Sequence, residues 1–104
     1  MDFAVNETGA AGNIDSLIFN TVYIGGSVAS GVNKSYALYS AVNSNTRRFI
    51  NNIFVNARST AGSTNLHYAM YIAAAGGTIT CNYNDYWVSG TGGILGYFGA
   101  NKTT

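Results

Sequence analysis

Few side chains in this sequence could do chemistry, and four stand out as candidate ligand contacts: Arg48, His67, Asp85 and Trp87. His67 is the only histidine and Trp87 the only tryptophan, while Asp85 ends an oxygen-rich run at residues 82–85 (Asn-Tyr-Asn-Asp). A hydrolytic triad would need a serine nucleophile and an aspartate beside His67, and no pattern marks them out. We therefore expect an exposed structural role for His67. We expect Asp85 to stabilise a turn, with a weak ion or sugar contact as its alternative.

The four carboxylates, Asp2, Glu7, Asp15 and Asp85, are spread along the chain. A calcium site takes six to eight oxygen ligands, several of them carboxylates. Glycoside hydrolysis needs two carboxyl groups about 5 to 9.5 Å apart. No cysteine and histidine stand at zinc-ligand spacing. The sequence therefore predicts no catalytic, cofactor-binding or metal-binding residues.

Arg47 and Arg48 are adjacent on a predicted strand, so alternation points one side chain inward and the other outward. A buried, unpaired arginine is unfavourable. We therefore expect one of them to lie at an edge or to meet a carboxylate of a partner chain. A solvated face is the alternative.

The composition indicates an all-β chain. Among 104 residues there are 13 glycines and thirteen asparagines but no proline, and 9% of residues are charged. Glycine and asparagine are poor in helix interiors and common where the backbone turns. Tyr, Phe, Ile, Val and Thr supply typical strand residues. At this length we expect a single domain, residues 1–104.

The charge and hydropathy patterns bear on partners and location. A formal net charge of +1 gives no broad basic surface for nucleic acid or an anionic membrane. No apolar run approaches the roughly 20 residues of a membrane-spanning helix. The N-terminus has no signal-peptide pattern, so the protein is cytoplasmic or its signal has been removed. The single Cys81 forms no internal disulfide.

Two families of segments repeat along the chain with a period of about 32 residues. Residues 18–24, 49–55 and 83–88 carry asparagine between apolar runs, and residues 3–5, 36–39 and 68–71 are short aromatic and apolar runs. Such self-similarity is typical of repeat proteins. Short strands and turns favour a β-solenoid with coils at about 3–35, 36–67 and 68–94 and a partial fourth coil at 94–99.

The register of this repeat predicts particular contacts. Asn20, Asn51 and either Asn82 or Asn84 would form a hydrogen-bonded corner ladder, with a one-residue insertion near residues 82–84. Rows of stacked rings would form from Phe3, Tyr36 and Tyr68, and from Tyr23, Phe54 and either Tyr86 or Trp87. The expected core residues are Ile18, Val22, Ala37, Leu38, Ile50, Ile53, Ala69, Met70 and Cys81.

These segments resemble known repeats. Residues 50–56 (Ile-Asn-Asn-Ile-Phe-Val-Asn), 67–71 (His-Tyr-Ala-Met-Tyr) and 83–87 (Tyr-Asn-Asp-Tyr-Trp) are similar to repeats of right-handed parallel β-helix proteins of the pectate-lyase-like superfamily. The resemblance covers most of residues 14–99. It implies a right-handed parallel β-helix and, for many relatives, a secreted or cell-surface location.

The resemblance suggests two functions. One is a non-catalytic β-helix module with a binding role, for example toward carbohydrate, or with a structural or assembly role. The alternative is a polysaccharide lyase or glycoside hydrolase remnant whose site, drawn from Arg47, Arg48, His67 and Asp85, is completed by oligomerisation. The poverty in carboxylates favours the first function.

The ends of a three-coil solenoid would expose unpaired strands, which invite pairing with another chain. Neither end shows a capping helix or a run of charges. The chain is then either a piece of a longer β-helix or a small protein that caps its ends by forming a homo-oligomer. We favour the homo-oligomer.

Overall fold

The computed structural model describes residues 1–61 and 65–103, and in this part of the chain every regular element is a β-strand. The prediction of an all-β protein is confirmed. The strands are β1 (Asp2–Glu7), β2 (Ile14–Ile18), β3 (Thr21–Ile24), β4 (Ser27–Val28), β5 (Ser35–Ser40), β6 (Thr46–Ile50), β7 (Ile53–Asn56), β8 (Ser59–Thr60), β9 (His67–Ile72), β10 (Thr78–Asn82), β11 (Asp85–Val88), β12 (Gly93–Phe98) and β13 (Asn101–Lys102).

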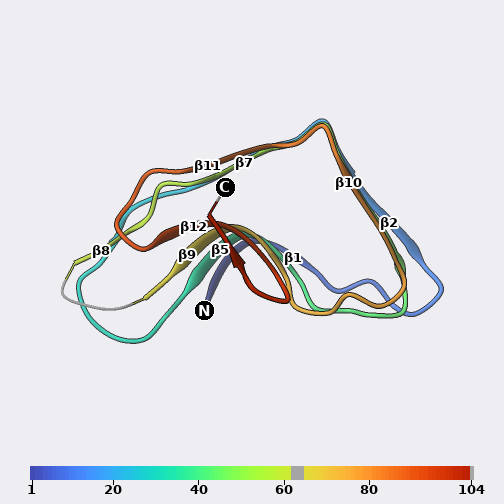
Figure 1. Ribbon diagram of the computed structural model, residues 1–104, viewed down its shortest axis with the longest axis horizontal. Coiled ribbons are helices and arrows are strands. Elements are labelled where there is room, and N and C mark those ends of the chain that lie inside the picture. The colour runs from blue at the N-terminus through green and yellow to red at the C-terminus, as the bar shows by residue number, and fades with distance from the viewer. Residues whose placement is uncertain (62–64, 104) are drawn as a thin grey trace.

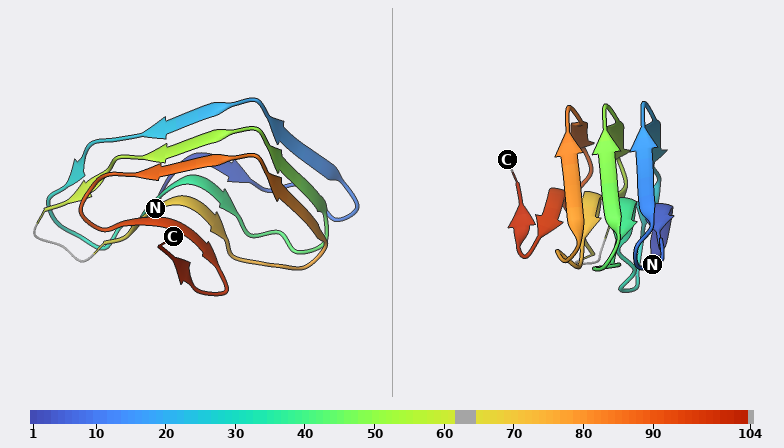
Figure 2. Two further views of the ribbon diagram at one scale, coloured as in Figure 1. Left: turned by 45° about the horizontal axis from the view of Figure 1, so that its top comes forward. Right: turned by 90° about the vertical axis from the view of Figure 1, so that its right-hand side faces the viewer.

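The strands form separate sheets, in which all pairings except β12 with β13 are parallel. Sheet A has the order β1-β5-β9-β12-β13, sheet B the order β2-β6-β10 and sheet C the order β3-β7-β11, while β4 pairs with β8. Successive passes of the chain lie side by side, so in Figure 1 β10 lies in front of β2, with β6 between them in the sheet, and β7 runs beside β11. Figure 2 shows the corresponding strands of three passes next to one another.

In the pairings that join the first three passes, paired residues are 32 or 33 positions apart in sequence, whereas β12 pairs with β9 at a shorter spacing, with Gly93 opposite His67. Phe3 pairs with Tyr36 in sheet A, and Tyr36 pairs with Tyr68, as the repeat predicts. The predicted second coil, 36–67, includes residues 62–64, which lie outside the described residues. Each pass thus adds one strand to each of sheets A, B and C.

The corner between sheets B and C has a different register from the predicted one. Phe19, Asn51 and Tyr83 adopt left-handed φ values of 58°, 56° and 55°. The residues that follow them form the ladder, because Asn52 Oδ1 accepts the backbone N–H of Asn20 (3.0 Å) and Asn84 Oδ1 accepts that of Asn52 (2.9 Å). The predicted pairing of Asn20 with Asn51 is wrong by one residue.

With Asn20, Asn52 and Asn84 aligned, the separation is 32 residues at both steps. The predicted insertion near residues 82–84 is therefore wrong. Asn52 also donates to Leu17 O (2.7 Å), and Asn84 donates to Phe49 O (2.7 Å). The ladder fixes the corner because the side-chain amides of Asn52 and Asn84 each bond both to the asparagine of the preceding pass and to the backbone of that pass.

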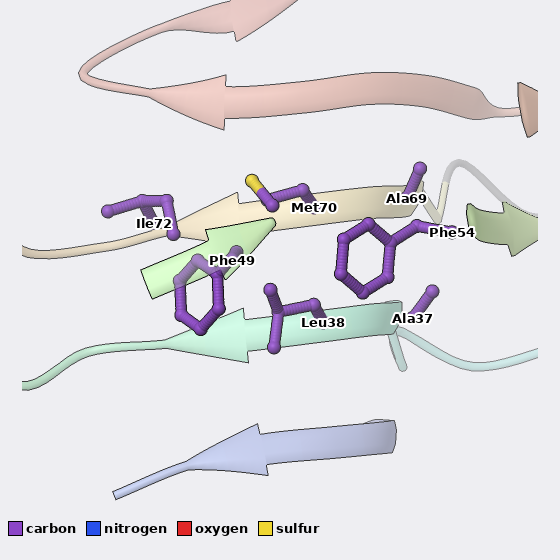
Figure 3. Close-up of a cluster of buried hydrophobic side chains, with 7 residues drawn as sticks. All are labelled: Ala37, Leu38, Phe49, Phe54, Ala69, Met70 and Ile72. Carbon is purple, nitrogen blue, oxygen red and sulfur yellow. The ribbon is translucent and has the colours of Figure 1, made fainter. Parts of the chain in front are cut away.

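The apolar core lies between sheets A, B and C. Figure 3 shows its buried members. They are Ala37, Leu38, Phe49, Phe54, Ala69, Met70 and Ile72. The predictions for Ala37, Leu38, Ala69 and Met70 are confirmed, and Val22 is partly buried against this cluster.

The predictions for Ile18, Ile50 and Ile53 are wrong. Ile18 and Ile53 are exposed and Ile50 is only half-buried, because Phe49 and Phe54 occupy the inward positions of β6 and β7. Alternation then turns their isoleucine neighbours outward.

The prediction of Cys81 as a core residue is also wrong. Cys81 follows Phe49 in the inward row of sheet B, yet it is exposed because no further strand of the described residues covers β10.

The aromatic rows are confirmed in part. Phe3 stacks on Tyr36 with ring centroids 5.4 Å apart, and Tyr36 stacks on Tyr68 at 5.5 Å. Phe54 stacks on Tyr86 at 5.9 Å. Tyr23 and Trp87 are not in that row, since both pair with Val55.

Candidate functional site

The outer face of sheet C displays two exposed aromatic residues that share one register row. Tyr23 is 67% exposed and Trp87 is 60% exposed, and both pair with Val55 of the central strand β7. A second row on the same face contains Asp85 at one end. The sheet C face is defined by Thr21, Tyr23, Ile53, Val55, Asp85 and Trp87.

The asparagine corner fixes the register in which the strands of sheet C begin. Ile53 N donates to Asn20 O and Asp85 N donates to Asn52 O, both at 2.8 Å. Strands β3, β7 and β11 therefore start in step, and the third residue of each faces outward. Because neighbouring strands lie about 4.8 Å apart, the backbones carrying Tyr23 and Trp87 are about 9.6 Å apart.

This arrangement can bind a flat, partly apolar ligand. Aromatic rings offer large apolar faces at low conformational entropy. Asp85 and Thr21 place oxygen atoms in the adjacent row, where they can bond to ligand hydroxyl groups. The predicted contacts Asp85 and Trp87 thus lie on one face, joined by Tyr23.

Arg48 lies elsewhere. It is exposed on the outer face of sheet B, in a row with Ser16 and Thr80. The prediction that one arginine points inward and the other outward is confirmed, since Arg47 is fully buried.

His67 is fully buried, so the expectation of an exposed role is wrong. Its Nδ1 lies 2.8 Å from Ser35 Oγ and its Nε2 lies 2.7 Å from Thr60 Oγ1. Asn56 Nδ2 donates to Ser35 Oγ (3.0 Å) and Thr60 donates to Asn65 O (2.8 Å). The His67 cluster is Ser35, Asn56, Thr60 and His67.

These partners define the tautomer. Thr60 gives its only proton to the Asn65 carbonyl, so His67 Nε2–H donates to Thr60 and Nδ1 accepts from Ser35. Burial lowers the pKa of His67, Arg58 lowers it further and Asp2 partly opposes this. The imidazole is therefore a neutral link between two hydroxyl groups, with both ring nitrogens occupied.

Arg47 is held within its own chain. Its Nη1 donates to Ser40 Oγ (2.8 Å), and its Nη2 donates to Ala74 O (2.9 Å) and Gly76 O (2.7 Å). The prediction that an arginine lies at an edge or meets a partner chain's carboxylate is wrong for this residue, because a serine hydroxyl and two backbone carbonyls of its own chain accept its hydrogen bonds instead.

Two carboxylates missed by the sequence prediction come together beside Arg47. Asn45 Nδ2 lies 2.8 Å from Glu7 Oε1 and 2.9 Å from Asp15 Oδ2. Glu7 also accepts from Ser40 Oγ and from Gly9 N, both at 2.7 Å. The Arg47 cluster is Glu7, Asp15, Ser40, Asn45 and Arg47.

Two neighbouring carboxyl groups, as in Glu7 and Asp15, are the residue types that glycoside hydrolysis uses. Here, however, Glu7 accepts three hydrogen bonds from its own chain, so its lone pairs stabilise the fold. A signal was present in the sequence, since the repeat aligns Glu7 with Ser40 and Asp15 with Arg47.

The tyrosines of sheet A pack mainly against one another. Tyr36 and Tyr68 are 3% and 2% exposed, and Tyr39, Tyr71 and Tyr97 form a second stacked row. Burial and the neighbouring tyrosines raise the pKa of Tyr36 to about 12. The rings of Tyr36 and Tyr68 are therefore closed to a ligand, unlike those of Tyr23 and Trp87, whereas Tyr39, Tyr71 and Tyr97 are half-buried.

His67 and Arg47 are bound near opposite ends of β5, to Ser35 and Ser40 respectively. Five residues of a strand span about 16 Å. One chain therefore does not bring Arg47, Arg48, His67 and Asp85 into one site.

Across residues 1–61 and 65–103, no three His, Cys, Asp or Glu side chains gather closely enough to hold a metal ion. The same residues contain no helix that could cross a membrane. Comparisons with models of known protein families, with curated protein sequences and with solved structures found no match.

Proposed function

We propose that this chain is a right-handed parallel β-helix module that binds an uncharged polysaccharide on the sheet C face, without catalysing a reaction. The β-helix is supported by the in-register parallel pairing at 32 or 33 residues in three sheets. Each pass of the chain would form one coil.

One observation carries the binding role: two exposed aromatic side chains, Tyr23 and Trp87, share one row on a rigid sheet. A pyranose ring presents a flat face of C–H groups, which packs on an aromatic ring, and a rim of hydroxyl groups. Two rings about 9.6 Å apart would engage separate sugar units of one chain. An extended polymer fits this row better than a monosaccharide does.

The polarity of the face favours an uncharged sugar chain. Asp85 is its one charged residue, and it is a hydrogen-bond acceptor for sugar hydroxyl groups. An acidic polysaccharide would meet a like charge there. The side chains of His67, Arg47 and Glu7 are engaged in hydrogen bonds within the chain, which supports a binding role over catalysis.

Affinity electrophoresis through gels containing uncharged polysaccharides such as xylan or β-glucan tests this function. We expect retardation of the wild-type chain and a loss of affinity of about tenfold in Trp87→Ala and in Tyr23→Ala, since each removes one stacking contact.

Tyr83→Asn is the matched control. It removes an exposed aromatic side chain at the corner but installs the residue found at the equivalent, left-handed position Asn51. Equal loss in Tyr83→Asn and Trp87→Ala, or no retardation of the wild type by any uncharged polysaccharide, would contradict the proposal.

A further inference from the structure

The two edges of the strand stack are complementary to each other. The N-terminal edge consists of β1, β2 and β3, and the C-terminal edge consists of β10 and β11 together with β12 on β9. The asparagine ladder is open at both edges: among the described residues, Asn20 Oδ1 and the backbone N–H of Asn84 make no hydrogen bond. Asn20 instead turns its amide to its own Ile18 O (2.9 Å).

A second copy stacked head-to-tail would complete this ladder. Its Asn20 Oδ1 would accept from Asn84 N, as Asn84 Oδ1 accepts from Asn52 N within the chain. Its Asn20 amide would reach the Cys81 carbonyl, which follows Leu17 O and Phe49 O in the series. The donor at one edge thus matches the acceptor at the other.

The apolar rows also continue across such a contact. At the C-terminal edge, Met70, Cys81 and Tyr86 line a cavity of about 490 Å³. Within the chain the residues that precede them in these rows are Leu38, Phe49 and Phe54, and before those Val5, Leu17 and Val22. Val5, Leu17 and Val22 of a second copy are therefore the side chains that would fill the cavity.

The charges at the two edges are opposite. Lys102 lines the C-terminal cavity, whereas Glu7 and Asp15 line a hollow of about 190 Å³ at the N-terminal edge. Head-to-tail stacking keeps these carboxylates away from the acidic hollow of another copy. A head-to-head contact would instead place two acidic hollows together.

Strand β12 occupies part of this site. It pairs with β9 in parallel, with Gly93 opposite His67 and Gly96 opposite Met70. The β1 strand of a second copy would need the same place, with Asp2 opposite His67 and Val5 opposite Met70. Because Gly96 has no side chain, β12 leaves unfilled the space that Val5 would take.

We propose that the C-terminal edge binds the N-terminal edge of a second copy. Residues 93–102 occupy the position beside β9 until β1 of the second copy displaces them. The contact repeats from copy to copy without closing. The sheet C face takes no part in this contact. The proposed stacking can therefore be tested independently of polysaccharide binding.

Disulfide trapping in the full chain tests the register. Leu17→Cys would meet the native Cys81 of another copy in adjacent strands, at a separation that a disulfide spans. Within one chain these positions are two strands apart, at about 9.6 Å, too far for a disulfide. We expect oxidation of Leu17→Cys to give a series of linked dimers, trimers and longer species on a non-reducing gel.

Three controls accompany it. Adding Cys81→Ser should abolish the series, and Ile18→Cys, in the row of Asn82, should link at least about tenfold more slowly. Gly96→Val should slow trapping about fivefold by filling the cavity from β12, since a Cβ there has only an ordinary contact of 3.6 Å with Met70 O. Linked species that persist without Cys81, or equal rates for Leu17→Cys and Ile18→Cys, would overturn the proposal.

Sedimentation under reducing conditions provides a measurement without an introduced cysteine. We expect concentration-dependent association of the wild-type chain and weaker association of Asn20→Ala. The loss should be about fivefold, for one net hydrogen bond, because the Asn20 amide already bonds to Ile18 O in the single chain. A wild-type chain that remains a monomer at every concentration would also overturn the proposal.

Discussion

The His67 cluster and the Arg47 cluster lie near opposite ends of β5, and they satisfy buried polar groups in different ways. The His67 cluster is neutral, and its hydrogen bonds run in one direction from Ser35 through His67 and Thr60 to the Asn65 carbonyl. The Arg47 cluster contains a guanidinium and two carboxylates, linked through Ser40 and Asn45.

The two clusters also differ in how fully their buried polar atoms are hydrogen-bonded. Both ring nitrogens of His67 have partners, whereas Arg47 Nε and Asn45 Oδ1 are buried without a hydrogen-bond partner among the described residues. The comparison teaches that the residues most suggestive of chemistry are bound inside the fold. On the outer surface, in contrast, Tyr23 and Trp87 are exposed and available to a ligand.

The largest expected effect comes from removing the cation of the charged cluster. Arg47→Met should lower the free energy of unfolding by about 3 kcal/mol or more, because three acceptors lose a charged donor and two carboxylates lose the nearby positive charge. Urea unfolding measures this.

Arg48→Met is its matched control on the same strand, and it should change stability by less than about 0.5 kcal/mol because Arg48 is exposed. Similar losses of unfolding free energy in the two variants would contradict the assignment of a stabilising role to the buried hydrogen bonds of Arg47.

The two serines of β5 compare the clusters directly. Ser40→Ala should cost about 2 kcal/mol, since Ser40 links two charged groups, whereas Ser35→Ala should cost about 1 kcal/mol, since its partners are neutral. Urea unfolding of the two variants in parallel tests the order. A larger loss in Ser35→Ala would contradict the assignment.

The neutral cluster should also make stability depend on pH. Burial lowers the pKa of His67 in the folded chain, so the unfolded chain binds more protons below about pH 6.5. The full contribution to stability is then present above about pH 6.5 and is lost as the pH falls through the folded pKa, at up to about 1.4 kcal/mol per pH unit.

Urea unfolding between about pH 7.5 and pH 5 measures this slope. The variant His67→Gln should lose it, because glutamine does not titrate there. An unchanged slope in His67→Gln would assign the pH dependence to other groups.

The strands and their period were predictable because glycine, asparagine and aromatic residues recur every 32 or 33 positions. The ladder was misplaced because Asn51 and Asn52 are adjacent, and only the left-handed φ of Asn51 shows which one turns the chain. The inward positions were misassigned at Ile18, Ile50 and Ile53 because an apolar side chain does not reveal its face when its neighbour is also apolar.

The candidate site was predictable in part. Trp87 and Asp85 lie on one face as neighbouring members of β11, but Tyr23 joins them only through the pairing of three passes. The burial of His67 depends on Ser35, Asn56 and Thr60, and that of Arg47 on carbonyls at residues 74 and 76. Such partners are set by folding of distant segments, which local sequence patterns do not encode.

The most direct test of the sheet C face uses its own fluorophore. Trp87 is the only tryptophan and is 60% exposed, so its emission reports this face alone. We expect a titration with xylan or β-glucan to shift the emission of Trp87 to shorter wavelength and to protect it from acrylamide quenching, with both effects weakened in Tyr23→Ala. Emission and quenching that stay unchanged at saturating polysaccharide would contradict the proposed binding face.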